Sequence, residues 1–218
     1  MSRAVVLFSG GQDSTTCLWW ARERFSEVRA VSIDYGQRHR TELDAAAHIA
    51  SVARVPHEVL RLDALAQLGG NALVDASRPV VGVAGGLPST FVPMRNVLFL
   101  TLAAARAVQW GAESVVCGAC ETDFSGYPDC RRNTMDALET ALSIAVNGRV
   151  RIDTPLMWLT KAETVRMARS MPGCWEALAL SVTCYHGQRP GCGACHACSL
   201  RARGFQGANE TDPSTEIA

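Results

Sequence analysis

Glycine and hydroxyl residues typical of a phosphate-binding loop follow an apolar run near the start of the chain. The run Val5–Phe8 predicts a buried strand, and the turn after it opens directly into a helix. Gly10 and Gly11 can adopt positive φ and carry no Cβ, so successive backbone amides can face one anion. The helix start adds its positive dipole end. We therefore predict a polyphosphate site formed by Phe8, Ser9, Gly10, Gly11, Gln12, Asp13, Ser14 and Thr15.

Asp13 lies inside this loop, where its negative charge would repel a phosphate group. Its predicted role is therefore to bind a Mg²⁺ ion that bridges phosphate oxygens. A helix cap after a strand is the simpler explanation of a Ser- and Asp-rich turn, but the S-G-G-x-D-S pattern favours phosphate binding. No G-x-x-x-x-G-K-[ST] sequence is present, so the loop is not a Walker motif.

Four of the nine cysteines form a short cluster near the C-terminus. Cys184, Cys192, Cys195 and Cys198 have spacings that allow four thiolates to surround one tetrahedral Zn²⁺ ion. Four sulfur ligands leave no open coordination position, so the predicted role of the zinc is structural. The alternatives are His196 as a replacement ligand, an iron–sulfur cluster, and a zinc ribbon that binds nucleic acid.

The segment 122–131 gathers groups suited to a planar, polar ligand. Two carboxylates can accept the paired N–H donors of a guanine-like edge, two aromatic rings offer stacking faces, and an arginine can form a fork on a carboxylate. We predict substrate contacts for Asp123, Phe124, Tyr127, Asp129 and Arg131. A turn built from Asp, Gly and Pro is the simpler alternative.

Strand and helix patterns alternate along the chain at the spacing of βαβ units. Strands are predicted at 5–8, 28–33, 57–62, 114–118 and 150–153, and helices at 14–24, 41–53, 96–110, 136–146 and 160–169. Residues 64–93 are rich in Gly and Pro and predict a long loop. The predicted fold class is α/β, a doubly wound parallel sheet of about five strands with ligands beyond the carboxyl ends of the strands.

Length and composition fit one α/β domain with a small appendage. The chain has 218 residues, 48% of them hydrophobic, and 21 Lys+Arg balance 21 Asp+Glu. A small-molecule substrate is therefore favoured over nucleic acid, and the absence of a signal or membrane-spanning pattern predicts a cytoplasmic protein. We divide the chain into a nucleotide-binding domain (1–170), a zinc-binding module (171–206) and a disordered tail (207–218).

The N-terminal loop resembles the PP-loop of the ATP pyrophosphatases, which grips the pyrophosphate that leaves when a substrate oxygen attacks the α-phosphorus. Over almost its whole length the chain further resembles the QueC family of 7-cyano-7-deazaguanine synthases. The shared motifs are F-S-G-G-Q-D-S-T-T-C-L, D-Y-G-Q-R-H, F-V-P-x-R-N, E-T-D-F-S-G-Y-P-D-C-R, T-P-L-M-W-L-x-K-A-E-T and T-C-Y-x-G with its cysteines. Two residues depart from this pattern: Arg132 stands where many members have an acidic residue, and Met94 where glycine is frequent.

This resemblance implies a homodimeric, zinc-containing ligase that uses ATP and Mg²⁺ to convert 7-carboxy-7-deazaguanine and ammonia to the nitrile, on the route to queuosine and related deazapurines. The further nucleotide contacts that we expect are Asp34, Tyr35, Gln37, Arg38, Arg95, Asn96 and Gly118. The predicted catalytic residues are Asp13, Lys161 and Arg131. Lys161 stands at a helix start, where a cation opposes the dipole, so phosphate binding explains it better than helix stability does.

Three other functions are considered alongside the ligase. An enzyme of this kind could pass the activated deazaguanine carboxylate to a larger amine on a protein or nucleic acid. The neutral charge argues against tRNA thiolation, and the intact phosphate loop argues against a non-enzymatic zinc-ribbon module. Cys117 and Cys120 form a C-x-x-C pair that we interpret as a packed strand end rather than a redox centre.

Overall fold

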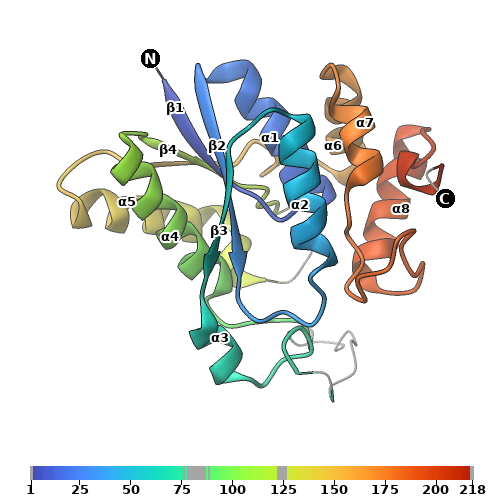
Figure 1. Cartoon of the computed structure of the whole chain (residues 1–218), viewed down its shortest axis with the longest axis horizontal. Coiled ribbons are helices and arrows are strands. Elements are labelled where there is room, and N and C mark those ends of the chain that lie inside the picture. Colours follow the sequence, from blue (N-terminus) through green and yellow to red (C-terminus); the bar gives the residue numbers. More distant parts are fainter. Residues whose placement is uncertain (1, 76, 78–86, 88, 122–126, 217–218) are drawn as a thin grey trace.

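A single parallel sheet forms the centre of the molecule. The computed structural model describes residues 2–75, 77, 87, 89–121 and 127–216. Five strands pair in the order β3-β2-β1-β4-β5, all in parallel (Figure 1). They are β1 (Arg3–Leu7), β2 (Glu27–Asp34), β3 (His57–Arg61), β4 (Ser114–Val116) and β5 (Arg151–Asp153). The predicted fold class is confirmed.

Helices cover both faces of this sheet (Figure 1). They are α1 (Gln12–Arg24), α2 (Thr41–Val52), α3 (Asp63–Leu68), α4 (Arg95–Trp110), α5 (Arg132–Ala145), α6 (Lys161–Ser170), α7 (Cys174–Leu180) and α8 (His196–Ala208). Strand β1 shows the two-sided burial, because successive side chains point to opposite faces. Ala4 and Val6 pack with α1, α2, α6 and α7, whereas Val5 packs with α4. Within the described part of the chain, no helix is long and apolar enough to cross a membrane.

The C-terminal end of the chain is more structured than the sequence predicts. Helix α8 continues to Ala208, and a 3₁₀ turn follows at Pro213–Thr215. Asp212 accepts hydrogen bonds from Nε and Nη2 of the buried Arg201, at 2.5 and 2.8 Å. The predicted disorder is therefore wrong for residues 207–216, because a charged hydrogen-bond pair fixes a segment that composition alone marks as solvent-exposed.

The predicted domain boundary at residue 170 crosses a continuous core. Cys174, Ala177 and Leu178 of α7 are fully buried in the same cluster as Ala4 and Val6 of β1. The segment before the cysteine cluster thus packs on the nucleotide-binding sheet itself. The division into a separate zinc-binding module stays a prediction. The part of that module formed by α7 shares its core with the larger domain.

The region that we predicted as a long loop, 64–93, is partly helical. Helix α3 covers its first residues, because the segment Asp63–Leu68 buries Leu65 against the sheet. Residues 76, 78–86 and 88 lie outside the described residues. The loop prediction is therefore wrong at its start.

Helix α6 begins where the sequence predicts, with Thr160 as its N-cap. Thr160 Oγ1 accepts a hydrogen bond from the Glu163 backbone N–H at 3.2 Å, and Glu163 Oε2 accepts one from the Thr160 N–H at 2.8 Å. This capping box satisfies two backbone donors and fixes the helix start. Lys161 consequently occupies a defined position, the first residue of α6.

Candidate functional site

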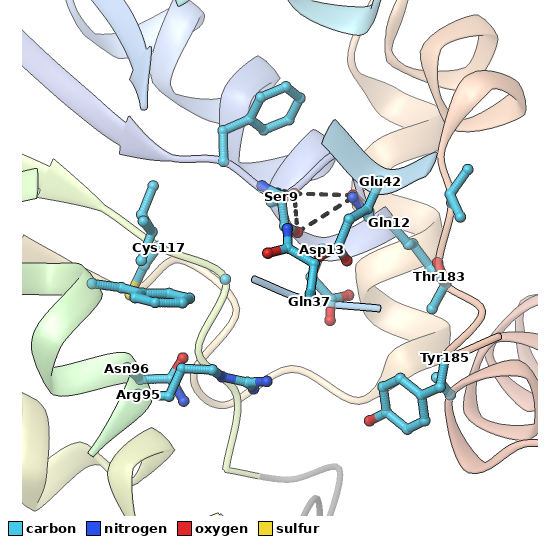
Figure 2. A pocket seen from close by; sticks show the side chains of 18 of the residues that line it. Ser9, Gln12, Asp13, Gln37, Glu42, Arg95, Asn96, Cys117, Thr183 and Tyr185 are labelled. Atoms are coloured by element: carbon cyan, nitrogen blue, oxygen red, sulfur yellow. Dashed lines mark hydrogen bonds between the residues drawn. The ribbon is translucent and has the colours of Figure 1, made fainter. Parts of the chain in front are cut away.

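A cavity of about 370 Å³ lies beyond the carboxyl ends of β1, β2 and β4. Strands β2 and β3 lie on one side of β1, and β4 and β5 lie on the other side. The order in which strands are added to the sheet therefore reverses between β1 and β4. Ligands of open α/β sheets bind at such switch points. The walls come from the loop after β1, the segment after β2, the starts of α1 and α4, the turn after β4 and the segment 182–187 (Figure 2).

Gly10 allows helix α2 to pack directly on the phosphate loop. Its φ is +75°, and a Cβ there would lie 2.6 Å from backbone atoms of both Glu42 and Ala46. Gly11 differs from our expectation of positive φ: its φ is −82°, and it forms the N-cap of α1. Of these two loop glycines, Gly10 alone is left-handed, and a side chain at that position would collide with α2.

Hydrogen bonds within the loop hold its shape and leave other polar groups for a ligand. Ser9 N–H donates to Ser14 Oγ at 3.2 Å, and Ser14 Oγ donates to the Gly11 carbonyl at 3.1 Å. In contrast, the Gln12 side-chain amide and the Thr15 hydroxyl are buried with no hydrogen-bond partner among the described residues. Buried polar groups normally have partners, so the Gln12 amide, which lines the cavity at a helix start, fits ligand oxygens. Gly10 and Thr15, which we also expected in the phosphate site, are not among the lining residues.

Asp13 and Lys161 meet in the cavity although 148 positions separate them in sequence. Lys161 Nζ donates to Asp13 Oδ2 at 2.6 Å, whereas Asp13 Oδ1 is buried without a partner in the described part of the structure. One carboxylate oxygen is thus left for a cation. A Cβ on Gly118 would lie 3.0 Å from Asp13 Cβ, and one on Gly204 would lie 2.9 Å from Lys161 Cβ. These glycines let the chain after β4 and helix α8 approach the pair.

The segment after β2 supplies one wall of the cavity. The residues of this segment that line it include Tyr35, Gln37, Arg38 and Glu42. Gln37 Oε1 accepts a hydrogen bond from the Tyr35 N–H at 3.0 Å, which closes the turn. Asp34, which we expected in the nucleotide site, instead accepts from Arg40 at 2.8 Å and is not among the lining residues. The sequence analysis missed Glu42, whose pKa is raised by burial.

Arg95 projects into the cavity from the first turn of α4 (Figure 2). The three tyrosines of the chain, Tyr35, Tyr127 and Tyr185, all interact electrostatically with it. The Arg95 guanidinium carbon lies 5.8 Å from the centroid of the Tyr127 ring. Burial raises the pKa of Tyr35 to about 12, so its hydroxyl stays protonated at neutral pH. A permanent positive charge therefore faces the cavity beside the neutral hydroxyl of Tyr35.

Asp129 fixes the start of α4. Its Oδ2 accepts a hydrogen bond from the Asn96 N–H at 2.9 Å, and Asn96 Nδ2 donates to Cys130 Sγ at 3.3 Å. The carboxylate is buried, and its Oδ1 has no partner among the described residues. One oxygen of this predicted substrate contact thus serves to cap a helix that carries Arg95 and Asn96 into the site.

The structure brings only part of the predicted substrate loop to the cavity. Tyr127 lines it, and its hydroxyl lies 2.6 Å from Thr90 Oγ1. Arg131, the residue that we expected to form a fork on the substrate carboxylate, is exposed and is not among the lining residues. Asp123 and Phe124 lie outside the described residues.

The segment 182–187 forms a wall that the sequence analysis missed. Val182 N–H donates to the Gly10 carbonyl at 3.0 Å, so this segment contacts the phosphate loop. Arg201 Nη1 donates to Thr183 Oγ1 at 3.0 Å, and both residues line the cavity. Tyr185 also lines it (Figure 2), and burial raises the pKa of its hydroxyl. The T-C-Y motif, which contains the first cysteine of the cluster, was the available signal.

The four clustered cysteines come together in a geometry that could bind zinc. The Sγ atoms of Cys184, Cys192, Cys195 and Cys198 all lie within 4.8 Å of one another, and those of Cys192 and Cys198 are 3.9 Å apart. Tetrahedral zinc with Zn–S bonds of about 2.3 Å requires sulfurs about 3.8 Å apart. The Cys195 N–H donates to Cys192 Sγ at 3.3 Å. His196 is exposed, so four sulfurs are the donor set that fits.

Comparison with protein-family models places this chain among known proteins. A model described as "Queuosine biosynthesis protein QueC" matches residues 3–209. The chain belongs to the QueC family. Relatives named 7-cyano-7-deazaguanine synthase include those of Chromobacterium violaceum, Laribacter hongkongensis and Lysinibacillus sphaericus, which are 55%, 53% and 49% identical. The alignments cover 98%, 96% and 93% of this chain and 93%, 93% and 94% of the relatives. The predicted family is confirmed.

Two solved structures share the fold at low sequence identity. A predicted subunit of a tRNA methyltransferase from Methanocaldococcus jannaschii has a TM-score of 0.52 at 18% identity, over 78% of this chain and 75% of that one. A 4-thiouridine synthetase, solved with RNA and bound ATP, has a TM-score of 0.51 at 18% identity, over 95% of this chain and 50% of that one. At this identity the likeness concerns the fold alone.

The two departures from the QueC pattern lie outside the cavity lining. Met94 is the N-cap of α4 and has a φ of +62°, a conformation that favours glycine. Arg132, at the start of α5, donates to Asp136 at 2.5 Å and to Thr154 Oγ1 at 2.8 Å. The departures therefore affect helix starts, and their side chains do not reach the ligand space described above.

Proposed function

We propose that this QueC family member is a 7-cyano-7-deazaguanine synthase, an ATP-dependent ligase that converts 7-carboxy-7-deazaguanine and ammonia to the nitrile. The observation that carries the proposal is one cavity with two differently equipped ends. The PP-loop end offers unpaired polar groups to a polyphosphate. The Arg95 end offers a cation and aromatic rings to a planar anion. The names of relatives about half identical to this chain support the same reaction.

The reaction requires two activations. A carboxylate oxygen of the substrate attacks the α-phosphorus of ATP and pyrophosphate leaves, which gives an acyl adenylate. Ammonia attacks the acyl carbon, AMP leaves, and loss of a proton gives the amide. The amide oxygen then attacks a second ATP. Loss of AMP and of the remaining nitrogen protons gives the nitrile. Both adenylations use the same phosphate end of the cavity.

The residues at the phosphate end suit a leaving pyrophosphate. Lys161 already lies 2.6 Å from Asp13, so its charge needs no large movement to meet the negative charge that develops on the leaving group. Gln12 provides an unpaired side-chain amide at the start of α1. An Mg²⁺ ion held at Asp13 Oδ1 would neutralise phosphate oxygens. Bringing the two substrates together in one cavity supplies much of the remaining rate enhancement.

We propose a structural role for zinc at the four cysteines. A closed shell of four sulfurs has no position for substrate, so zinc would stabilise the segment that carries Tyr185 into the cavity. The resemblance also implies a homodimer, which analytical ultracentrifugation can check. Ammonia as the nitrogen donor is likewise part of the proposal.

Isotope-labelled ammonia tests the reaction directly. The purified chain is incubated with 7-carboxy-7-deazaguanine, ATP, Mg²⁺ and ¹⁵N-ammonia, and the products are analysed by mass spectrometry. We expect a nitrile that carries one ¹⁵N atom, with two AMP and two pyrophosphate formed for each nitrile. ADP and phosphate as the nucleotide products would contradict adenylation.

A second function is an outcome of the same experiment. An enzyme that conjugates the activated deazaguanine to another amine would release AMP but would give little nitrile with ammonia. A product whose mass includes an added larger amine would favour that function. Arg132 is half-buried, pairs with Asp136 and does not line the cavity, so its position does not favour this second function.

A further inference from the structure

We infer that Arg95 binds the carboxylate of the acid substrate, and that this residue makes the site prefer the acid over the neutral amide intermediate. The inference rests on the proposed function and deepens it. It transfers to Arg95 the role that sequence analysis gave to Arg131, and it removes Arg95 from the expected nucleotide contacts. Four observations support it, concerning charge, surroundings, location and the geometry of the helix start.

The first observation concerns the charge of Arg95. Within the described part of the chain, no carboxylate forms an ion pair with it. Arg201 shows how the same chain satisfies a buried structural arginine: Asp212 accepts two hydrogen bonds from it. The other Arg201 donors reach oxygens of Ser181, Thr183 and Leu178. A partly buried guanidinium without such a carboxylate is costly unless a ligand supplies the negative charge.

The second observation is that tyrosine hydroxyls surround Arg95. Burial raises the pKa of Tyr35 to about 12, so this phenol provides no negative charge at neutral pH. Burial raises the pKa of the nearby Glu42 carboxyl and the positive charge of Arg95 lowers it, but the two side chains form no ion pair. The hydroxyls can donate hydrogen bonds to an anion beside Arg95, but they cannot neutralise the guanidinium.

The third observation concerns location. Figure 2 shows Arg95 and Tyr185 on the side of the cavity away from Ser9 and Gln12. The phosphate end has its own cation, Lys161, so a phosphate bound there does not need Arg95. Aromatic pairs lie beside Arg95: Tyr35 with Phe99 at 5.3 Å and Phe91 with Tyr127 at 5.9 Å between ring centroids. These surroundings suit a flat ring that carries a carboxylate.

The fourth observation is that the position of Arg95 is fixed. The buried Asp129 caps the first turn of α4 through the Asn96 N–H at 2.9 Å, so the backbone that carries Arg95 is held in place. A guanidinium presents parallel N–H donors in a planar fork, which matches the two oxygens of a carboxylate. An amide in the same place loses the charge and one acceptor oxygen. Arg95 should therefore assist the first activation more than the second.

The experiment measures binding and the two halves of the reaction separately. Calorimetry gives the Kd of 7-carboxy-7-deazaguanine, of the corresponding amide, and of ATP for wild type, Arg95→Met and Arg95→Lys. We expect Arg95→Met to weaken acid binding about 10-fold or more, because a charge-assisted fork is lost. Amide and ATP binding should change far less. Conversion of supplied amide to nitrile should continue, while conversion of acid to amide slows through a raised KM.

Two variants serve as comparisons. Arg95→Lys keeps the positive charge but loses the planar fork, so it should bind the acid with intermediate affinity. Partial acid binding in Arg95→Lys would also show that the loss in Arg95→Met does not come from a folding defect. Arg61 is exposed, pairs with Asp63 at 3.1 Å and does not line the cavity, so Arg61→Met should leave every affinity unchanged.

Several outcomes would overturn the inference. Equal losses of acid and amide binding would mean that Arg95 does not recognise the charge, and a selective loss of ATP binding would return it to the nucleotide site. Selective loss of acid binding in Arg131→Met, with Arg95→Met unaffected, would restore the original assignment. A wild-type chain that binds neither deazaguanine would refute the proposed function, and the inference with it.

Discussion

The phosphate end and the Arg95 end of the cavity are built in opposite ways. At the phosphate end, the loop Ser9–Ser14 makes most of its hydrogen bonds within itself. At the Arg95 end, Tyr35, Arg95, Tyr127 and Tyr185 come from four separate segments, and long-range contacts such as that between Asn96 and Asp129 hold them together. Local hydrogen bonds shape the phosphate loop, although Lys161 reaches it from α6 and α2 packs on Gly10. The Arg95 end, in contrast, has no such local motif and depends on contacts between distant segments.

This difference predicts how mutations should act. A polar substitution in the phosphate loop should change the chemistry and leave the fold intact, because the hydrogen bonds that shape the loop are short-range. Changes in the segments that support the cavity from a distance should alter stability, because they break contacts between elements. The predictions below test this separation, from the largest expected effect to the smallest.

Asp13→Asn should give the largest effect. We expect kcat to fall about 100- to 1000-fold, because the amide removes the predicted Mg²⁺ ligand and the charge that holds Lys161. The free energy of unfolding should stay near that of wild type, since Asn can still accept a hydrogen bond. Steady-state AMP release and urea unfolding provide the two measurements.

Asp63→Asn is the matched control for that substitution. Asp63 is exposed and pairs with Arg61 outside the cavity, so this variant should keep full activity. If Asp13→Asn also kept wild-type kcat, Asp13 would be no more than a helix-start residue. A large loss of stability in Asp13→Asn would show that the phosphate end is not locally determined.

The same difference explains what could be predicted from the sequence. The PP-loop and the cysteine cluster are contiguous, so their residue types and spacing predicted both places directly. The Arg95 end could not be assembled in this way, because nothing in the sequence shows that Tyr185 meets Arg95 or that Asp129 caps α4. The prediction of a disordered tail was wrong for a similar reason, since composition does not reveal that Asp212 pairs with Arg201.

Removal of zinc should give the next largest effect. Cys195→Ala should abolish stoichiometric zinc binding and lower the free energy of unfolding by about 4 kcal/mol, the linkage expected at a thousandfold excess of zinc over its Kd. Metal analysis and urea unfolding, with and without a chelator, measure both. His196→Ala should keep one zinc per chain, because His196 is exposed. Equal stability of the zinc-loaded and chelated wild type would contradict a structural site.

Asp212→Asn tests how much the contact between Asp212 and Arg201 stabilises the fold. Removing the charge from the pair with Arg201 should cost about 2–3 kcal/mol at pH 7. Although burial raises the pKa of Asp212, hydrogen bonds from Arg201 outweigh it and hold the pKa below its ordinary value.

The sign of the pH dependence follows from that lowered pKa. The charged form contributes stability above the pKa of the unfolded chain, about 4, and this contribution is lost as pH falls through the lower pKa of the folded chain. The difference in urea unfolding between wild type and Asp212→Asn should therefore shrink below about pH 4. A difference that is constant from pH 7 to pH 3 would mean that the charge of Asp212 does not stabilise the fold.

Met94→Gly should have the smallest effect, and it acts at the Arg95 end. Met94 holds a φ of +62° directly before Arg95, and its side chain is 63% exposed, so glycine would remove backbone strain and lose little burial. Removing the backbone strain should stabilise the folded chain by about 1–2 kcal/mol, and the greater freedom of glycine in the unfolded chain should offset part of this. We therefore expect the free energy of unfolding in urea to rise by about 0.5–1 kcal/mol. Asn147, with a φ of +48°, is the control: asparagine tolerates this conformation, so Asn147→Gly should gain less.

Because Asp129 independently caps the first turn of α4, the KM of the acid substrate should not change in Met94→Gly. If that KM rose while stability increased, the strained residue itself would be orienting Arg95, and the Arg95 end would depend on local backbone as the phosphate end does.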